Sequence, residues 1–151
     1  MTRAALPHLL AHEPALIVNV SGLTRAFPAP FLAIHSGSKS FVLGFSRALS
    51  LELSLVQPTH DVECIGVDVH NVSSNSNSSP SSFFTPTGEV EGKAIIGVVG
   101  CGKRVVTAYW PHELMSWVLA LMPKSVMDRI MTISLVDMRK RELQIEATKN
   151  K

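Results

Sequence analysis

Charged residues are scarce in this sequence of 151 residues. Asp, Glu, Lys and Arg make up 17% of it, and the formal net charge is only +2. So weak and mixed a charge lacks the strong basic footprint typical of proteins that bind nucleic acid. The basic residues gather near the C-terminus, in DMRKREL and ATKNK, where a solvated helix face and tail are the simpler interpretation. We therefore expect no nucleic-acid partner.

Long apolar runs and cysteine motifs are also missing. No stretch of eighteen uncharged apolar residues occurs, so the sequence predicts no membrane span. Pro7, two histidines and Glu13 interrupt the apolar N-terminal segment, which argues against a cleaved signal peptide. Cys64 and Cys101 lie in apolar surroundings without CxxC spacing, a pattern typical of buried free thiols in a reducing compartment. The six histidines show no metal-ligand spacing, and we expect no metal site.

Hydrophobic residues make up 46% of the chain, enough for one modest core and a single globular unit. ALIVNV at 15–20 predicts a strand buried on both faces, and VECIGVDV at 62–69 predicts a second strand. Between them, apolar residues at helical spacing predict a helix over about 36–56: Val42, Phe45, Leu49 and Leu53. Strand, helix and strand in this order indicate a βαβ crossover with parallel strands and an α/β fold.

The remaining segments predict a loop, a strand and three helices. NVSSNSNSSPSSFFTPTG has the composition of a loop or flexible flap, over about 71–85. A helix with several glycines follows over 88–100, and a third strand is expected at 104–110.

Two helices then meet at Pro123. We divide the chain into an α/β part, 1–110, and a helical extension with a basic tail, 111–151. Trp110 and Trp117 are interpreted as core residues or membrane-facing anchors of the last helices.

GVVGCGKR at 97–104 fits the GxxxxGK pattern of phosphate-binding loops. The next residue should be Ser or Thr to hold magnesium, and here it is Arg104. The glycines also precede the expected strand, whereas in a phosphate-binding loop they follow one. A glycine-rich turn is therefore the better interpretation.

Several stretches resemble the C-terminal part of short-chain dehydrogenases/reductases, and most of all the very-long-chain 3-oxoacyl-CoA reductases and type 12 17β-hydroxysteroid dehydrogenases. IVNVSG is similar to the family's strand that carries the catalytic Ser. FPAPFLAIHSGSKSFVLGFSRALSLEL is similar to its Pro-x-Pro segment, YSGSK motif and following helix. SSFFTPTGE, TAYWPHELMSWVLALMPKSVMDRI and DMRKREL are similar to the C-terminal region of these reductases. The resemblance implies a partial Rossmann-type fold, a doubly wound parallel sheet without its N-terminal cofactor-binding half.

The resemblance also implies where the catalytic residues lie. The family's Tyr protonates the carbonyl oxygen, and a Lys four residues later assists it and bonds the nicotinamide ribose. In this sequence these positions hold His35 and Lys39, and Gly22 stands at the position of the catalytic Ser. An imidazole can donate a proton near neutral pH, but it is shorter than a phenol, and the nearby Lys39 disfavours the imidazolium form. Ser21, one position away on the strand, is expected to point to the opposite face.

After the second strand the family carries a Pro that touches the nicotinamide, and Val67 stands there instead. The polar residues that follow, Asp68 and His70, are interpreted as a strand end that enters a loop.

By resemblance the cofactor is NADP, and the chemistry is reduction of a 3-oxoacyl-CoA or related ketone in lipid or secondary metabolism. The resemblance implies association with the endoplasmic reticulum membrane, and the location is otherwise expected to be cytoplasmic. Because the family's glycine-rich pyrophosphate turn precedes the segment to which this chain corresponds, we expect weak cofactor binding and impaired or absent catalysis. One alternative is a truncated, inactive pseudoenzyme that acts by pairing with itself or with an intact relative through the helix at 36–56. The other is a protein that contacts membrane surfaces through its C-terminal helices.

Overall fold

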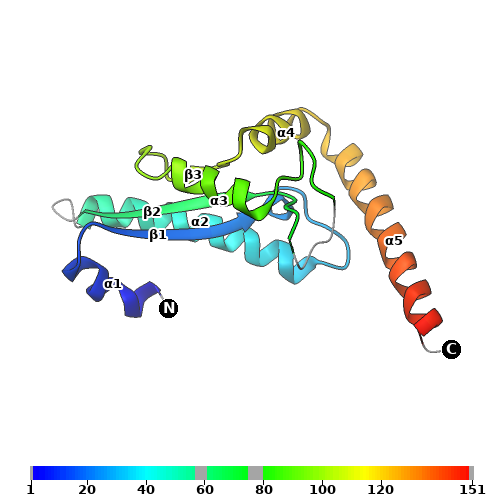
Figure 1. Cartoon of the computed structure of the whole chain (residues 1–151), viewed down its shortest axis with the longest axis horizontal. Helices are drawn as coiled ribbons and strands as arrows, with labels where there is room; N and C mark the ends of the chain where they lie inside the picture. The colour runs from blue at the N-terminus through cyan, green and yellow to red at the C-terminus, as the bar shows by residue number, and fades with distance from the viewer. Residues whose placement is uncertain (1, 57–60, 75–79, 150–151) are drawn as a thin grey trace.

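A three-stranded parallel sheet forms the centre of the molecule (Figure 1). The computed structural model describes residues 2–56, 61–74 and 80–149. The strands are β1, Ala15–Gly22, β2, Val62–Val69, and the short β3, Val105–Val106, in the order β1-β2-β3. Register runs from Ala15 opposite Val62 to Gly22 opposite Val69. The predicted α/β fold with parallel strands is therefore confirmed.

Helices cover both faces of this sheet to different extents. The elements outside the sheet are α1, Thr2–Ala11, the short 3₁₀ helix η1, Leu23–Arg25, α2, Ala33–Val56, α3, Gly88–Gly97, α4, Trp110–Ala120, and α5, Lys124–Lys149. On one face, Leu49 and Leu53 of α2 bury Cys64 of β2. On the other, residues of α3 and the turn after it pack on Ile65, Val67 and Val106. The strand–helix–strand crossover predicted from periodicity is thus present.

The close approach of α2 to β2 depends on Gly66. A Cβ atom at this position would lie 3.0 Å from Leu43 Cδ1 and 3.0 Å from Ser46 Cβ. Contacts this short are tighter than packed interiors favour, so a larger residue would push α2 and the strand apart by a few tenths of an ångström. Leu43 and Ser46 are accordingly buried. The predicted sheet-facing residue Phe45 is instead exposed, because the crossing turns Leu43 and Ser46 toward the sheet.

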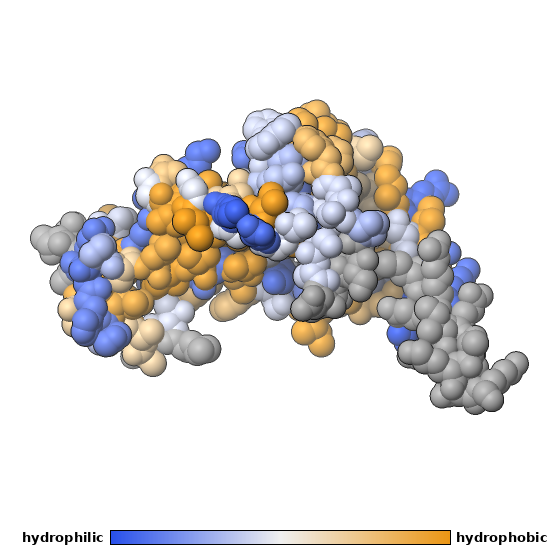
Figure 2. Space-filling view, in the orientation of Figure 1, coloured by the Kyte–Doolittle hydropathy of each residue, from blue (hydrophilic) through white to orange (hydrophobic). Residues whose placement is uncertain are grey.

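Strand β1 differs from the prediction that both of its faces would be buried. Its Leu16, Val18 and Val20 side chains are 39%, 38% and 46% exposed. These alternate residues lie on one face of the strand. Helix α3 does not cover them, because it packs on residues of the neighbouring strands β2 and β3. Figure 2 shows apolar side chains gathered over the region where β1 runs. The described structure therefore leaves an aliphatic strip open on this edge strand.

The third strand is shorter than the predicted 104–110. Only Val105 and Val106 pair with β2, since the chain then turns to bring the Tyr109 hydroxyl within 3.2 Å of the Phe83 carbonyl. Pro111 stands in the first turn of α4, which ends extended structure at that point. The two C-terminal helices meet at Pro123 as predicted.

The two tryptophans belong to α4 and to neither core cluster. Trp110 and Trp117 are both more than 60% exposed, so the interpretation as core residues was wrong. Figure 1 shows α5 leading away from the sheet, with Met127 of its first turns buried. Among the described helices, none combines the length and hydropathy that a membrane crossing requires.

The polar insert is a loop as predicted, and residues 75–79 of it lie outside the described residues. Its described parts carry isolated bridges, between Ser73 and Thr87 and between Ser82 and Thr85. One cysteine prediction was wrong. Cys64 is buried, but Cys101 is exposed because it lies in the turn before β3.

Candidate active site

Lys39 lies where β1 ends, at the first turns of α2. Its ammonium Nζ donates a hydrogen bond of 3.3 Å to the carbonyl oxygen of Val20. The main chain at Lys39 is held as well, since the buried Ser21 hydroxyl donates to the Lys39 carbonyl at 2.8 Å. Strand and helix therefore fix both ends of this residue. Lys39 is half-buried, so its charge remains accessible at the carboxyl edge of the sheet.

His35 precedes Lys39 by one turn of α2. The 3.6-residue period places side chains four apart on the same face of a helix, and both residues line one shallow hollow of about 400 Å³. The His35 residue is exposed. Its carbonyl accepts a hydrogen bond from Ser38 at 2.7 Å, whereas its imidazole makes no hydrogen bond to the described residues. The imidazole is thus open to solvent, and no described residue orients it by a hydrogen bond.

Gly22 leaves open the space beside Lys39. A Cβ atom there would lie 4.0 Å from Lys39 Cε and 3.3 Å from the Val69 carbonyl oxygen. A serine at this position would therefore place its hydroxyl next to the Lys39 side chain after a small shift of the strand end. Ser21 does not substitute for it, because its hydroxyl is committed to the Lys39 carbonyl.

The end of β2 carries a buried carboxylate, that of Asp68, whose ion pair was not predicted from the sequence. Asp68 is a strand residue, 1% exposed, and it binds Arg25 of η1 with Arg25 Nε to Asp68 Oδ2 at 2.8 Å and Arg25 Nη2 to the same oxygen at 2.7 Å. A buried carboxylate requires such a partner. The predicted strand end that enters a loop is confirmed, with Asp68 near the end of β2 and His70 after it. The ion pair ties η1 to the sheet beside the hollow. Forty-three positions separate the two residues, and no local pattern links them.

A second imidazole, that of His70, reaches the hollow from the loop after β2. Its ring stacks on that of His112, with centroids 4.7 Å apart and planes at 17°. Its Nε2 lies 3.0 Å from the Ser116 hydroxyl. Burial, followed by the neighbouring His112, lowers the pKa of His70 from 6.5 to about 4. His70 is therefore neutral at physiological pH.

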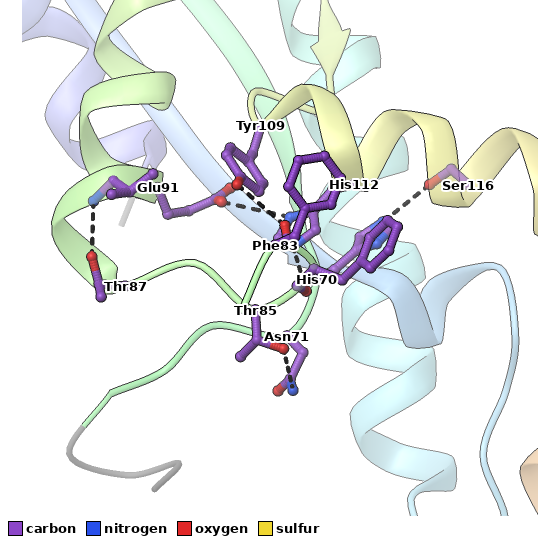
Figure 3. A network of polar contacts seen from close by, with 11 residues as sticks. His70, Asn71, Phe83, Thr85, Thr87, Glu91, Tyr109, His112 and Ser116 are labelled. Carbon is purple, nitrogen blue, oxygen red and sulfur yellow. Dashed lines mark hydrogen bonds and ion pairs between the residues drawn. The ribbon is translucent and has the colours of Figure 1, made fainter. Parts of the chain in front are cut away.

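The stack continues into a buried polar cluster (Figure 3). His112 is fully buried, its Nε2 lies 3.3 Å from the Phe84 carbonyl, and its Nδ1 lies 3.5 Å from Glu91 Oε2. Burial lowers the pKa of His112 and raises that of Glu91. Both directions favour the neutral forms, so an ion pair between them is disfavoured. The cluster joins α3, α4 and the polar insert, and it was missed because its members carry no common spacing.

The described residues fit only part of a nicotinamide cofactor. Lys39 offers an ammonium donor at the strand end, which suits ribose hydroxyl groups. A pyrophosphate is held by a glycine-rich turn that leads from a strand into a helix N-terminus. Within the described ranges the glycine-rich turn, 97–102, instead precedes β3. Described residues likewise form no cluster suited to a metal ion.

Known proteins resemble this chain in sequence. Very-long-chain 3-oxoacyl-CoA reductase of Anas platyrhynchos is 34% identical over 138 residues, which cover 87% of this chain and 41% of that protein. Inactive hydroxysteroid dehydrogenase-like protein 1 of Danio rerio is 28% identical and is matched over 39% of its length. The chain therefore spans about two fifths of these curated relatives. No family model matches it.

The fold is shared with a solved 7β-hydroxysteroid dehydrogenase. The TM-score is 0.70, with 16% sequence identity, and the match covers 85% of this chain and 50% of that one. This likeness confirms a partial Rossmann-type fold. The resemblance read from HSGSK and the segments around it is thus confirmed in sequence and in fold. The roles of Lys39, His35 and Gly22 stay predictions.

Proposed function

We infer that this chain is a relative of the very-long-chain 3-oxoacyl-CoA reductases and has part of a short-chain dehydrogenase/reductase fold. From this premise we propose that it forms the catalytic, substrate-facing part of a ketone reductase. The substrate would be a 3-oxoacyl-CoA or a related ketone, and the cofactor NADP. As the 151-residue chain alone, it would reduce ketones poorly or not at all.

The position of Lys39 is the observation that carries the proposal. Its ammonium group lies at the carboxyl end of β1, anchored by the Val20 carbonyl and facing a hollow. In this reaction class a reduced nicotinamide, when bound, supplies hydride. Negative charge then develops on the carbonyl oxygen, where a fixed cation such as Lys39 stabilises it. The arrangement at Lys39 suits this role without further rearrangement of α2.

Proton delivery is the weak point of the proposed site. His35 is the group nearest to the family's acid position, and as an imidazolium it could donate a proton to the oxygen. General acid catalysis requires the donor within hydrogen-bond reach of its acceptor. The exposed, unoriented ring of His35 and the missing hydroxyl at Gly22 both work against this. We therefore propose that proton transfer, together with cofactor binding, limits the isolated chain.

The test is NADPH oxidation with a 3-oxoacyl-CoA. We expect no activity in the 151-residue chain, whether unmodified, as His35→Tyr, or as His35→Tyr with Gly22→Ser. Groups that act as one unit are strongly non-additive, so a single repair restores little. The double variant in a chimera with the cofactor-binding half of an active relative should become active, since Lys39 and α2 already hold the geometry.

Two outcomes would decide against parts of this proposal. Activity in the unmodified chain would establish His35 as a working acid and refute the expected defect. An inactive but folded chimera that binds NADPH would refute the assignment of the site itself. As a control, Lys39→Met in the chimera should abolish turnover and preserve the fold.

A second candidate function is pairing without catalysis. Phe41 and Phe45 stack on each other on the outer face of α2, with ring centroids 5.9 Å apart, and Phe41 is 69% exposed. Exposed aromatic residues of this kind suit a protein partner. The partner would be a second copy or an intact relative.

A further inference from the structure

A basic groove lies between α2 and the glycine-rich turn before β3. Its volume is about 690 Å³, and four of its nine lining residues carry cationic side chains: Arg25, Arg47, Lys103 and Arg104. None of the lining residues is acidic. Lys39 and His35 do not line it, so it is separate from the candidate active site.

The backbone brings these cations together in a defined way. Gly66 allows α2 to approach the sheet closely, which places Arg47 next to the turn. Gly100 and Gly102 have positive φ angles of 78° and 72°, conformations that L-residues rarely adopt. The Gly66 amide donates to the Arg104 carbonyl at 2.9 Å. The turn that carries Lys103 and Arg104 is therefore fixed to the central strand.

Most of the charge in the groove has no counter-charge. Arg25 pairs with the buried Asp68. Arg47, Lys103 and Arg104 are exposed, and across the described residues none of them makes an ion pair. Asp61 and Glu63 line an adjoining hollow, which Lys103 and Arg104 also line. Glu63 accepts the Gly100 amide at 3.0 Å, so it fastens the turn.

Like charges that face one concave surface repel one another, and a multivalent anion relieves the repulsion. Arginine is particularly suited to this because its planar guanidinium binds two oxygens of one phosphate. The buried Leu43 side chain also lines the groove. The groove thus combines several charged donors with a firm apolar wall.

We propose that the basic groove binds a polyphosphate group, such as the diphosphate or triphosphate portion of a nucleotide or coenzyme. The cationic side chains would bind the phosphates. The glycine-rich turn before β3 therefore differs from a phosphate-binding loop. Its glycines precede a strand, and Arg104 stands where a magnesium-binding hydroxyl would be. Binding should therefore not require Mg²⁺, and Mg²⁺ should weaken it by competing for the phosphates.

Titration calorimetry of the 151-residue chain with sodium tripolyphosphate tests the site. We expect one saturable site that weakens with added salt. Arg47→Gln and Lys103→Gln should each weaken binding about tenfold, the effect of losing one charge-assisted contact. Both residues are exposed, so the variants should unfold at the same temperature as the parent. Lys124→Gln is the matched control, because it removes a cation that is also exposed and lies outside the groove, and it should change the affinity less than twofold.

Three further ligands distinguish a soluble source of the phosphates from a lipid source. ATP and coenzyme A represent soluble sources, and phosphatidylcholine vesicles with phosphatidylinositol bisphosphate represent a lipid headgroup. Binding of either kind that Arg47→Gln weakens about tenfold supports the groove and identifies the source. The proposal is overturned if neither tripolyphosphate nor these ligands bind saturably, or if Lys124→Gln weakens binding as much as Lys103→Gln does.

Discussion

The hydroxyl of Ser21 donates a 2.8 Å hydrogen bond to the main-chain carbonyl of Lys39, across eighteen positions of sequence. With the return bond from Lys39 Nζ to the Val20 carbonyl, the end of β1 and the start of α2 are joined twice. The lysine is therefore positioned by the secondary structure itself, so its geometry should survive changes at His35 and Gly22.

Cofactor affinity should be low in the isolated chain. The described residues offer Lys39 to a nicotinamide cofactor but no strand-to-helix glycine turn for its pyrophosphate. We expect NADPH to bind more weakly than about 1 mM in a fluorescence titration, and the chimera with a relative's cofactor half to bind far more tightly. Saturable binding of NADPH by the 151-residue chain in the micromolar range would contradict this expectation.

The ion pair between Arg25 and Asp68 should respond unequally to loss of its two members. Arg25→Gln leaves a carboxylate that is 2% exposed without its counter-charge, at a cost of about 3 kcal/mol or more. Asp68→Asn leaves an arginine whose side chain is 32% exposed, so water compensates and the cost should be roughly 1–2 kcal/mol.

Urea unfolding of both variants measures this asymmetry, and the double variant completes the cycle. It should be more stable than the sum of the single losses predicts. Strict additivity would mean that the pair contributes little to the fold, and a greater loss for Asp68→Asn would contradict the expected asymmetry.

Stability should fall on mild acidification because of His70. Its pKa is about 4 in the folded chain, against an ordinary value of 6.5, so between these values the unfolded chain binds a proton that the folded chain does not. The free energy of unfolding should therefore decrease as pH falls from 6.5 toward about 4. His112, with a lowered pKa, acts in the same direction, whereas Glu91, with a raised pKa, acts in the opposite one.

His70→Asn isolates the His70 contribution, because the variant keeps Asp68, Arg25, His112 and Glu91. Unfolding followed between pH 4 and 8 should show a slope that is shallower by up to one proton below pH 6.5. Identical slopes in parent and variant would show that the stacked imidazole titrates normally.

Gly66 of β2 and Gly44 of α2 should respond oppositely to alanine. At Gly66 the new Cβ meets Leu43 and Ser46 at 3.0 Å, and such overpacking costs typically about 1–3 kcal/mol. At Gly44, inside α2, nothing lies within 4 Å, and alanine should stabilise the helix by about 0.5–1 kcal/mol. Thermal unfolding compares them, and equal shifts of the same sign would refute the packing argument.

The outer face of α2 should mediate self-association. Sedimentation at high concentration should show a species larger than the monomer, or a shift on adding an intact relative. Phe41→Gln combined with Phe45→Gln should return the monomer. Ile133→Gln, an apolar-to-polar change at an exposed site of α5, should have no effect. A clean monomer of the parent chain, unaffected by the relative, would remove this surface as an interface.

Local patterns predicted much of the fold. The period of α2 and the aliphatic run of β2 are properties of contiguous residues, and both were located within a few positions. The uncovered face of β1, the short β3 and the exposed Cys101 were mispredicted, because each depends on what a distant segment covers or bonds. Tyr109, for example, leaves the sheet to reach Phe83.

Site residues from a local motif could likewise be found in the sequence, whereas those brought together by tertiary packing could not. Lys39 and His35 were identified because they stand in one short motif. The structure places both beside one hollow, and their roles stay predictions. Glu91, His112 and His70 meet only through tertiary packing. A buried glutamate in a helix that is otherwise weakly amphipathic leaves no signature in the sequence, so only the structure could reveal this cluster.

The aliphatic strip on β1 has a consequence for handling the protein. Leu16, Val18 and Val20 lie on the edge strand of the described sheet, and such an edge is a template for the addition of strands from other molecules. A charged residue in place of Val18 should act as a gatekeeper against aggregation. The solubility of the purified chain should therefore depend on how well this strip is shielded, and little on the strength of the core beneath it.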